Sequence, residues 1–308
     1  MDERHALIIY NPAAGKGDPD RRREELERLA LQAGWRGELV QTSLRESAGK
    51  LAAQGIRNGY RHIVVSGGDG TIMDLLPAIM GKDITLGVIP TGTGNLLALN
   101  LHIPLRLGAA VETALHGDPR QIAIGKANGH LFSIVAGIGF DAALIRDATP
   151  ELKRKYGLFA YVVSMLRNLA HLPHRYTVSV DDGTPQTYVA KSILVANMGR
   201  LQGGVIAVPH ADPETADLKI VIVRPESLLA WIGLILHALA GRIERHHSYT
   251  LLEGKRVRIR AVSGEQPVQC DGNLLSTSKH LFAEVAPEAV TIMRPRPVQI
   301  GRRLRART

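Results

Sequence analysis

The sequence predicts an α/β protein in which an open α/β domain is followed by a β-rich sandwich domain. Strand-like apolar runs begin near Ala6, Glu38, His62 and Thr85. Their spacing of about 25 to 30 residues fits successive βαβ units. After about residue 120 the runs are closer together and separated by turn residues, as in an antiparallel sandwich.

Helical patterns lie between the early strands. Apolar residues at helical spacing predict four helices. Gly117 is expected to end the last of them. They are the patterns over 26–33 and 48–55, the segment from Ile72 to Met80, and the segment from Leu107 to Leu115.

Turn signals organise the second half. Asn128-Gly129, the strongest short hairpin signal, separates the runs 121–127 and 130–135. Asp181-Asp182-Gly183 separates the strands expected over 176–180 and 188–196. Further strands are expected over 218–223, 256–261 and 281–285, and helices over 150–170 and 226–241. We therefore expect domains at 1–120 and 121–293 and a basic tail at 294–308, with the last strand or the tail returning to the first domain.

Composition favours a cytoplasmic globular protein. The 308 residues are 45% hydrophobic and 22% charged, which is ordinary for a soluble domain pair. A single cysteine, Cys270, excludes an internal disulfide and suits a reducing compartment. No signal segment is expected, because charged residues precede a short first apolar run. The longest apolar run, Leu228 to Leu236, is too short to span a bilayer, so a core or interface helix is favoured over insertion into the headgroup layer.

Net charge constrains the partners. The formal charge is +9, and the C-terminal segment holds a run of arginines without an acid. Such a tail favours anionic lipid surfaces or nucleic acid, and a solvated tail is the alternative. Aromatic residues make up 4% of the chain, so base-stacking platforms are scarce and no nucleic-acid partner is expected. The oligomeric state is left open, with a homodimer among the alternatives.

One loop predicts a phosphate site. The apolar run from His62 ends in the sequence Gly67-Gly68-Asp69-Gly70-Thr71 and is followed by a helical pattern. Glycines let a ligand approach bare backbone, and the amides that begin the next helix attract an anion. Asp69 would repel a naked phosphate, so it favours Mg²⁺ or an ordered water in between. The alternative for Asp69 is an ordinary turn aspartate.

Two further loops repeat the pattern. The run 6–10 ends in Asn11-Pro-Ala-Ala-Gly-Lys-Gly17, and the run 85–89 ends in Pro90-Thr-Gly-Thr-Gly-Asn95. In an open parallel sheet, ligands bind at the carboxyl ends of the strands, so three such loops on one edge predict one shared site. Lys16 does not make a P-loop, because Gly17 and Asp18 follow it instead of serine or threonine.

This ordered set of motifs resembles the diacylglycerol kinase/sphingosine kinase catalytic-domain family in its bacterial soluble form. The matching residues are Asn11-Pro12, Gly15-Lys16-Gly17, Thr42, 67–71, 90–95, Gly139-Phe-Asp141, Tyr156-Gly-Leu-Phe-Ala-Tyr161 and Asp271-Gly272. The resemblance implies an NAD kinase/diacylglycerol kinase-like nucleotide domain, a lipid-binding sandwich and a cleft between them. It also implies an ATP- and Mg²⁺-dependent lipid kinase that phosphorylates a lipid hydroxyl, diacylglycerol first, while associated peripherally with the membrane.

The resemblance also implies roles for individual residues. Phosphate contacts fall to Gly67, Gly68, Gly70 and Thr71, with Thr93 and Asn95 assisting and with Asn11 and Thr42 against the nucleoside. Asp69 would organise the metal, Asp141 would line the cleft near the lipid head, and Asp271 would be the general base. Turn and helix-cap chemistry is the alternative for Asn11, Thr93, Asp141 and Asp271.

Three departures from the family pattern leave rival functions open. Leu96 and Asn273 stand where the family carries acids, and the segment 211–219 lacks its usual Asp-Gly pair, which makes a structural metal there doubtful. One rival is a kinase that phosphorylates NAD. The other is a catalytically weak, nucleotide-binding lipid sensor.

Overall fold

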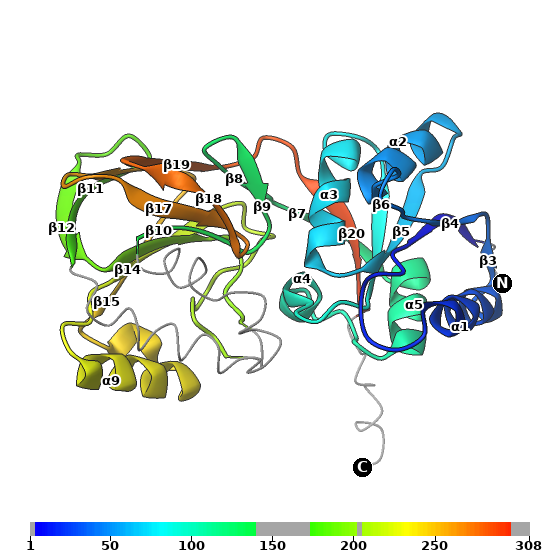
Figure 1. Ribbon diagram of the computed structural model, residues 1–308, viewed down its shortest axis with the longest axis horizontal. Coiled ribbons are helices and arrows are strands. Elements are labelled where there is room, and N and C mark those ends of the chain that lie inside the picture. The colour runs from blue at the N-terminus through cyan, green and yellow to red at the C-terminus, as the bar shows by residue number, and fades with distance from the viewer. Residues whose placement is uncertain (1–3, 140–172, 202–204, 297–308) are drawn as a thin grey trace, which may run out of the picture.

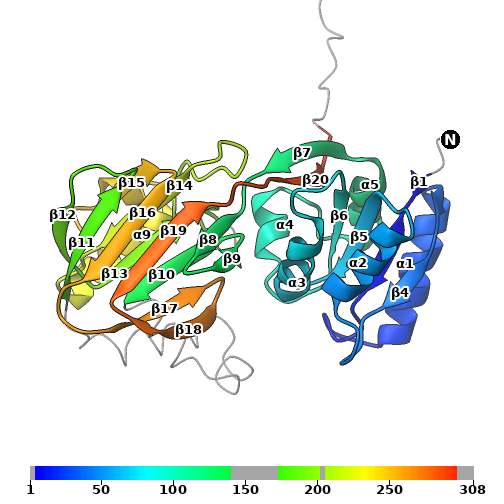
Figure 2. The same ribbon diagram turned by 90° about the horizontal axis from the view of Figure 1, so that it is seen from above.

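The computed structural model describes residues 4–139, 173–201 and 205–296, which form two parts side by side (Figure 1). One part is an open α/β unit and the other is a sandwich of two β-sheets, so the predicted fold class is confirmed. The chain crosses between the parts twice, after β7 (Asp118–Ile122) and before β20 (Val290–Arg294), as Figure 2 shows from above.

The α/β unit is built on a six-stranded sheet in the order β4-β2-β5-β6-β20-β7. All neighbours are parallel except β20 and β7, which are antiparallel. The strands not yet bounded are β2 (Leu7–Tyr10), β4 (Leu39–Gln41), β5 (His62–Gly67) and β6 (Thr85–Pro90), and a separate pair joins β1 (Arg4–His5) to β3 (Trp35–Arg36).

Helices cover both faces of this sheet, which explains its nearly uninterrupted apolar strands. In β2, Leu7 and Ile9 join the apolar cluster under α2 (Ala48–Arg57) and α3 (Asp69–Ile79). Ile8 and Tyr10 join the cluster under α1 (Pro19–Gln32) and α5 (Leu107–His116). Successive side chains of a strand point to opposite faces, so both faces are filled by one continuous run.

The second part is an antiparallel sandwich of two six-stranded sheets in the orders β15-β14-β13-β10-β17-β18 and β12-β11-β16-β19-β8-β9. Its strands are β8 (Gly125–Ala127), β9 (His130–Phe132), β10 (Val135–Gly139), β11 (His174–Val180), β12 (Gln186–Ala190), β13 (Ser192–Ala196), β14 (Leu218–Val223), β15 (Tyr249–Gly254), β16 (Arg256–Ala261), β17 (Gln266–Cys270), β18 (Asn273–Ser278) and β19 (His280–Val285). The predicted hairpin at Asn128-Gly129 is confirmed, because β8 and β9 pair across it and both turn residues have positive φ.

One predicted strand differs from the structure. The prediction of a single strand over 188–196 was wrong. The segment belongs to two strands in opposite sheets, β12 and β13, which are joined at Lys191. Ala190 and Ile193 face the same sandwich core, so the apolar pattern runs unbroken through the corner. The last strand, β20, lies in the first sheet, as one of the two expected alternatives had it, so residues 290–294 belong with the α/β unit although the expected domain range 121–293 included most of them.

The helix α9 (Leu228–Leu239) is not a core helix, which was one of the two forms, core or interface helix, that the sequence favoured. Among its residues only Leu234 is buried. Within the parts of the chain that the structure describes, none of the helices combines the length and apolar character needed to cross a bilayer.

The two parts share an apolar core. The cluster under α2 and α3 continues through α4 (Leu96–Asn100), whose Leu97 and Ala98 are buried in it. Ile134 and Met198 from the sandwich side belong to the same cluster. Asn197 adds polar links there, since its Nδ2 donates to the carbonyls of Ala123 (2.9 Å) and Ser133 (3.0 Å). The seam between the parts is therefore packed core rather than a flexible linker.

A largely buried ammonium group anchors the segment that leads into β14. The Lys219 side chain is 6% exposed, and its Nζ lies 2.9 Å from Asp217 Oδ2 and 2.5 Å from Glu253 Oε2. Burial by itself would raise the pKa of Asp217, but hydrogen bonds from Lys219 and Thr215 lower that pKa to about 2. At pH values above 3.8, the ordinary pKa of an aspartate, the ionised Asp217 therefore stabilises the fold. This contribution is lost as the pH falls through about 2.

Replacing Lys219 with methionine is expected to lower the free energy of unfolding by about 2–3 kcal/mol at pH 7, because two carboxylates lose their cation and one of them is largely buried. The difference from the wild type should shrink as pH falls from 5 to about 2, since Asp217 protonates more readily in the variant. Urea unfolding across this pH range measures both effects. Lys126→Met, at an exposed strand position, is the control; a pH-independent deficit would contradict the assignment.

Candidate functional site

The predicted loops meet at the carboxyl edge of the first sheet. Each residue that leaves a strand bonds to the next strand: the Asn11 amide donates to the Ser66 carbonyl, and the Thr91 amide donates to the Gly67 carbonyl, both at 2.9 Å. The Thr42 amide donates to the Tyr10 carbonyl at 2.9 Å. The three predicted loops therefore share one edge, and the end of β4 at Thr42 extends the row to four strand ends.

Close backbone approach explains two of the glycines in these loops. A Cβ built on Gly92 would lie 2.5 Å from the Cα of Gly68, so the second and third loops touch through bare backbone. Gly15 has φ +86°, and a Cβ there would lie 2.3 Å from the Thr91 carbonyl oxygen. Any larger residue at Gly15 or Gly92 would force the three loops apart.

Two predicted ligand-binding side chains contact each other directly. Asn11 Nδ2 donates to Thr71 Oγ1 at 2.8 Å, although sixty positions separate the two residues. Asn11 Oδ1 also accepts the Ala13 amide at 3.0 Å, which fixes the orientation of its amide plane. The first and second loops thus present a preorganised polar pair.

A cavity of about 610 Å³ opens beside this pair. Of the predicted set, Asn11, Thr42, Gly70 and Thr71 line it. Gly67, Gly68, Thr93 and Asn95 lie outside its lining. A space of this size is within the range of small-molecule and cofactor sites.

Sequence reasoning missed one wall of the cavity. Ser43, Leu44, Ser47 and Asp74 also line it. Ser47 caps α2 by accepting the Lys50 amide, a signal that helix-start rules could have found. Asp74 is placed by tertiary packing, since its Oδ2 accepts the Gly49 amide of α2 at 2.9 Å, and no local pattern predicts that.

Buried oxygens without partners lie beneath the loops. Within the described residues, Ser66 Oγ, Thr91 Oγ1 and Asn95 Oδ1 are buried and make no hydrogen bond. Asn95 adopts φ +49°, and its Nδ2 donates to the Gly92 carbonyl at 2.8 Å. Buried polar atoms normally have a partner, so this edge suits a polar ligand or ordered water. The residues present therefore fit a nucleotide.

Asp69 binds backbone in this structure. Its Oδ2 accepts the Leu96 amide and its Oδ1 accepts the Leu97 amide, both at 3.0 Å, so the carboxylate caps the first turn of α4. In the described part of the chain, no group of three or more His, Cys, Asp or Glu side chains is arranged to hold a metal ion. Direct ligation of Mg²⁺ by Asp69 together with neighbouring acids is thus not supported, and contact through water remains compatible with the geometry.

Asp271 is bound in a similar way from the other part of the molecule. It sits at φ +46° in the turn between β17 and β18. Its Oδ2 accepts the amide (2.6 Å) and the hydroxyl (3.0 Å) of Ser133, and its Oδ1 accepts the amides of Ile134 and Val135, both at 2.9 Å. Burial raises the pKa of Asp271 above its usual value, and this effect outweighs the hydrogen bonds from residues 133–135, which lower the pKa. A raised pKa suits a general base, whereas four donors suit a fixed structural acceptor.

Both carboxylates adjoin the same inter-domain cluster. Asp69 holds the amides of residues 96 and 97, and Asp271 holds those of residues 134 and 135. The side chains of all four of these residues belong to that cluster or pack against it. The two acids that the sequence singled out therefore flank one seam from opposite domains.

The departures from the family pattern are visible here as well. Leu96 is half-buried against the cluster, and Asn273 is exposed at the start of β18. Glu214 pairs with Arg294, and Asp217 is held by Lys219. Two of the three acids of 211–219 are thus bound by cations, while Asp212 accepts the backbone amide of Glu214 at 3.0 Å.

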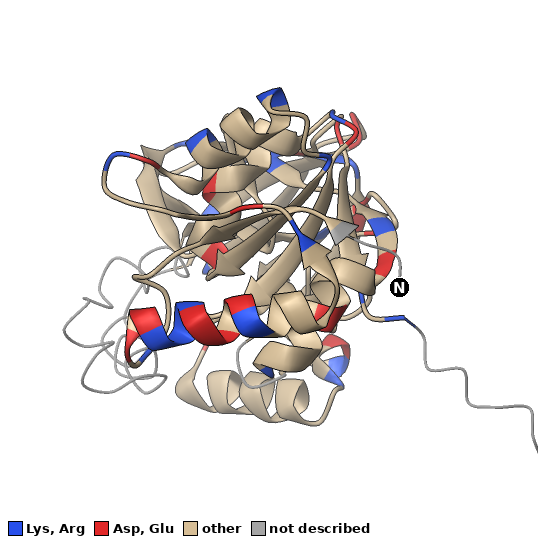
Figure 3. Ribbon diagram, turned by 90° about the vertical axis from the view of Figure 1, so that its right-hand side faces the viewer, with Lys and Arg blue, Asp and Glu red and all other residues tan. Residues whose placement is uncertain are grey.

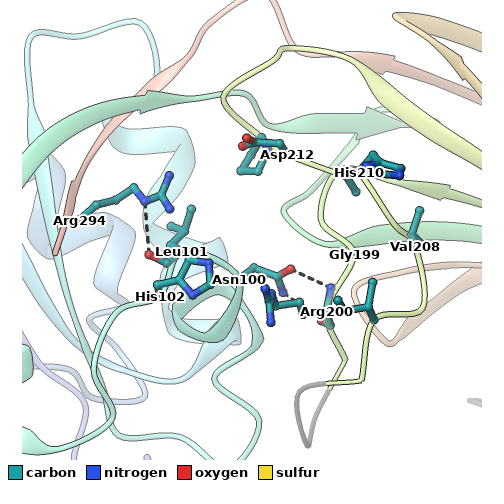
Figure 4. Close-up of a pocket in the computed structure, with 12 residues that line it drawn as sticks. Asn100, Leu101, His102, Gly199, Arg200, Val208, His210, Asp212 and Arg294 are labelled. Atoms are coloured by element: carbon teal, nitrogen blue, oxygen red, sulfur yellow. Dashed lines mark hydrogen bonds between the residues drawn. The ribbon is translucent and has the colours of Figure 1, made fainter. Parts of the chain in front are cut away.

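A second, smaller pocket of about 190 Å³ lies at the other end of α4 between the two parts (Figure 4). Asn100 crosses the seam: its Nδ2 donates to the Arg200 carbonyl at 2.9 Å and its Oδ1 accepts the Arg200 amide at 2.8 Å. Arg294 Nε donates to the Leu101 carbonyl at 3.3 Å. Burial, followed by the charges of Arg200 and Arg294, lowers the pKa of His102. This pocket is small, and charged and polar side chains line it together with apolar ones, so it does not suit a lipid tail.

Two parts of the predicted site lie outside the described residues. They are Asp141, expected near the lipid head, and the segment Tyr156 to Tyr161.

Comparisons with known proteins agree with this architecture. Residues 5–127 match the model of the diacylglycerol kinase catalytic domain, and residues 133–294 match that of the YegS C-terminal NAD kinase beta sandwich-like domain. A diacylglycerol kinase of Mycobacterium tuberculosis is 29% identical over 80% of this chain and 81% of its own length. One of Bacillus subtilis is 28% identical over 87% and 89%, respectively.

A solved structure gives the same picture of the fold. A diacylglycerol kinase from Bacillus anthracis superimposes with a TM-score of 0.78 at 23% identity, covering 96% of this chain and 98% of that one. The two family models together account for nearly all of the two-part architecture. The chain therefore belongs to the diacylglycerol kinase catalytic-domain family and is a kinase of the lipid kinase class.

Proposed function

We propose that this kinase transfers the γ-phosphate of ATP to the hydroxyl of a membrane lipid, and that the lipid is diacylglycerol. The observation that carries the proposal is the row of loops at the sheet edge, where Asn11 and Thr71 meet beside a cavity of about 610 Å³. The names of the relatives support diacylglycerol as the acceptor.

The nucleotide is assigned to the cavity. Asn11 and Thr42 would contact the nucleoside, and Gly70 and Thr71 would contact the phosphates at the start of α3. The buried, unpartnered oxygens of Thr91 and Asn95 lie outside the cavity lining, beneath the loops, where ordered water would satisfy them. Phosphoryl transfer depends mainly on positioning and charge stabilisation, which a preorganised backbone edge provides. Mg²⁺ would neutralise phosphate charge, with Asp69 acting on it through water.

The acceptor hydroxyl is placed next to Asp271 on the sandwich side, outside the packed core of the seam. Asp271 would take the proton of the lipid hydroxyl. The hydroxyl oxygen of the lipid then bonds to the γ-phosphorus of ATP, and the bond from that phosphorus to ADP breaks. The raised pKa of Asp271 brings the carboxylate closer to the range in which a base is effective. We place the enzyme at the membrane surface because its substrate lies there.

The direct test is an assay with radiolabelled ATP, Mg²⁺ and alternative acceptors. Label in phosphatidic acid, with diacylglycerol vesicles as substrate, is the expected result. Label only in NADP would identify an NAD kinase instead.

A catalytically weak sensor is the second candidate. It is favoured by Leu96 and Asn273 at positions where the family carries acids, and by the backbone-bound state of Asp69 and Asp271. Tight ATP binding without a phosphorylated product from any lipid class would support it.

Asp271→Asn is expected to reduce kcat by about 100-fold or more, since an amide cannot take the proton, while the dissociation constant for ATP stays unchanged. It should also lower the melting temperature, because an acceptor of four hydrogen bonds becomes neutral. Asp181→Asn is a matched control: Asp181 also has positive φ in a turn and accepts two amides, those of Lys255 and Arg256 at 2.8 Å. If both variants lose stability but neither loses kcat per folded molecule, Asp271 is structural only.

Thr71→Val is expected to weaken ATP binding by about 5- to 20-fold, because it removes the acceptor that positions Asn11 and a hydroxyl that faces the cavity. Calorimetric titration with a non-hydrolysable ATP analogue measures the change. Thr113→Val in α5 removes a comparable hydrogen bond, from its Oγ1 to the Ala109 carbonyl, and should leave ATP affinity unaltered. Equal affinities for Thr71→Val and the wild type would exclude this cavity as the nucleotide site.

A further inference from the structure

The helix α9 packs on the outside of the sandwich through one face. Trp231, Leu234 and Ala238 contact the apolar cluster that contains Val223 of β14 and Tyr249 of β15. In Figure 1 it appears as a separate helix outside β14 and β15. This inner face accounts for the attachment of α9 to the domain.

The opposite face of α9 is apolar and exposed. Six large side chains form it, with exposed fractions from 41% to 78%. Their spacing places them along a single stripe of the helix. They are Leu228, Leu229, Ile232, Ile235, Leu236 and Leu239.

No charged residue interrupts this stripe. The sequence of α9, LLAWIGLILHAL, contains no Asp, Glu, Lys or Arg. By contrast, α1 carries bands of acidic and basic residues, as Figure 3 shows. A contiguous apolar patch of this kind on a folded domain marks an interaction surface.

Size argues against a second copy of this chain as the occupant. The stripe consists of six large side chains on one side of a 12-residue helix that is about 18 Å long. A stable protein interface uses about 20–30 residues per partner. The stripe alone is therefore too small for a dimer.

Length and charge favour a bilayer surface. A helix this short cannot span the hydrocarbon core, but it can lie in the interface with its apolar face down. Arg242 and Arg245 follow it and are exposed. Of the nearby acids, Glu244 faces His210, whose Nε2 lies 3.7 Å from Glu244 Oε1, and Glu226 precedes the helix. The chain as a whole carries +9, which favours anionic headgroups.

We propose that the exposed face of α9 docks the protein on an anionic lipid bilayer, with Arg242 and Arg245 in the headgroup layer. The inference rests on the proposed lipid kinase function for its biological meaning. Docking itself is a binding property, and it can be measured whether or not any lipid is phosphorylated.

The first experiment is sedimentation with vesicles of phosphatidylcholine, with and without phosphatidylglycerol. The double variant Leu229→Gln/Leu236→Gln should bind at least about tenfold more weakly, because two exposed leucines no longer enter the interface. The control Leu31→Gln/Leu105→Gln changes two leucines of similar exposure in the α/β unit and should bind like the wild type. Arg242→Gln/Arg245→Gln should lose the preference for phosphatidylglycerol.

Several outcomes would overturn the proposal. They are a wild type that binds neither vesicle, an α9 variant that binds normally, and binding lost only when residues 297–308 are removed. A wild-type dimer that the α9 variant converts to a monomer would assign the face to a second copy. Protection of the side chains of 228–239 from hydroxyl-radical labelling in the free protein, together with unchanged vesicle binding by the variant, would mean that the chain itself covers the face.

A kinase assay separates this proposal from the proposed function. The α9 variant should lose activity toward diacylglycerol in vesicles but keep wild-type activity toward a short-chain, water-dispersed diacylglycerol. Absence of activity on both substrates in the wild type, with vesicle binding still dependent on α9, would refute the kinase proposal and leave docking intact. Full vesicle activity in the α9 variant would refute docking and leave the kinase proposal intact.

Discussion

A single apolar cluster joins the two parts of this molecule, and the candidate site is organised around it. Leu97 and Ala98 enter it from the α/β unit, and Ile134 and Met198 enter it from the sandwich. Because these side chains exclude water together, the two domains cannot move apart without exposing core. The distance between nucleotide edge and sandwich is thereby fixed by packing, as positioning-dependent chemistry requires.

The polar side of the seam depends on two carboxylates that hold backbone amides. Asp69 fixes the start of α4, and Asp271 fixes the segment 133–135. Each acid thus orders the chain segment whose side chains build the cluster. A carboxylate can accept hydrogen bonds from backbone amides and still act as a general base. Its pKa then depends on the balance between burial, which raises it, and those hydrogen bonds, which lower it.

The two domains carry different tasks in this arrangement. The sheet edge offers glycine backbone, an amide–hydroxyl pair and a cavity, which are features suited to phosphates and a nucleoside. The sandwich offers α9, with apolar side chains facing outward. Lys219 pairs with Asp217 and Arg294 pairs with Glu214, so two of the acids in 211–219 are bound by cations of the protein itself.

The sequence alone determined the α/β unit, the hairpin at Asn128-Gly129 and the loops that meet at the sheet edge, because strand periodicity and glycine-rich turns are local signals. Tertiary structure alone decided that 188–196 turns a corner between sheets and that one face of α9 is exposed, and it assigned to β20 the return to the first sheet that the sequence had left between the last strand and the tail. It also placed Asp74 at the cavity and the carboxylates of Asp69 and Asp271 on backbone amides. These outcomes depend on which distant segments share a surface, and a pattern of neighbouring residues does not encode that choice locally.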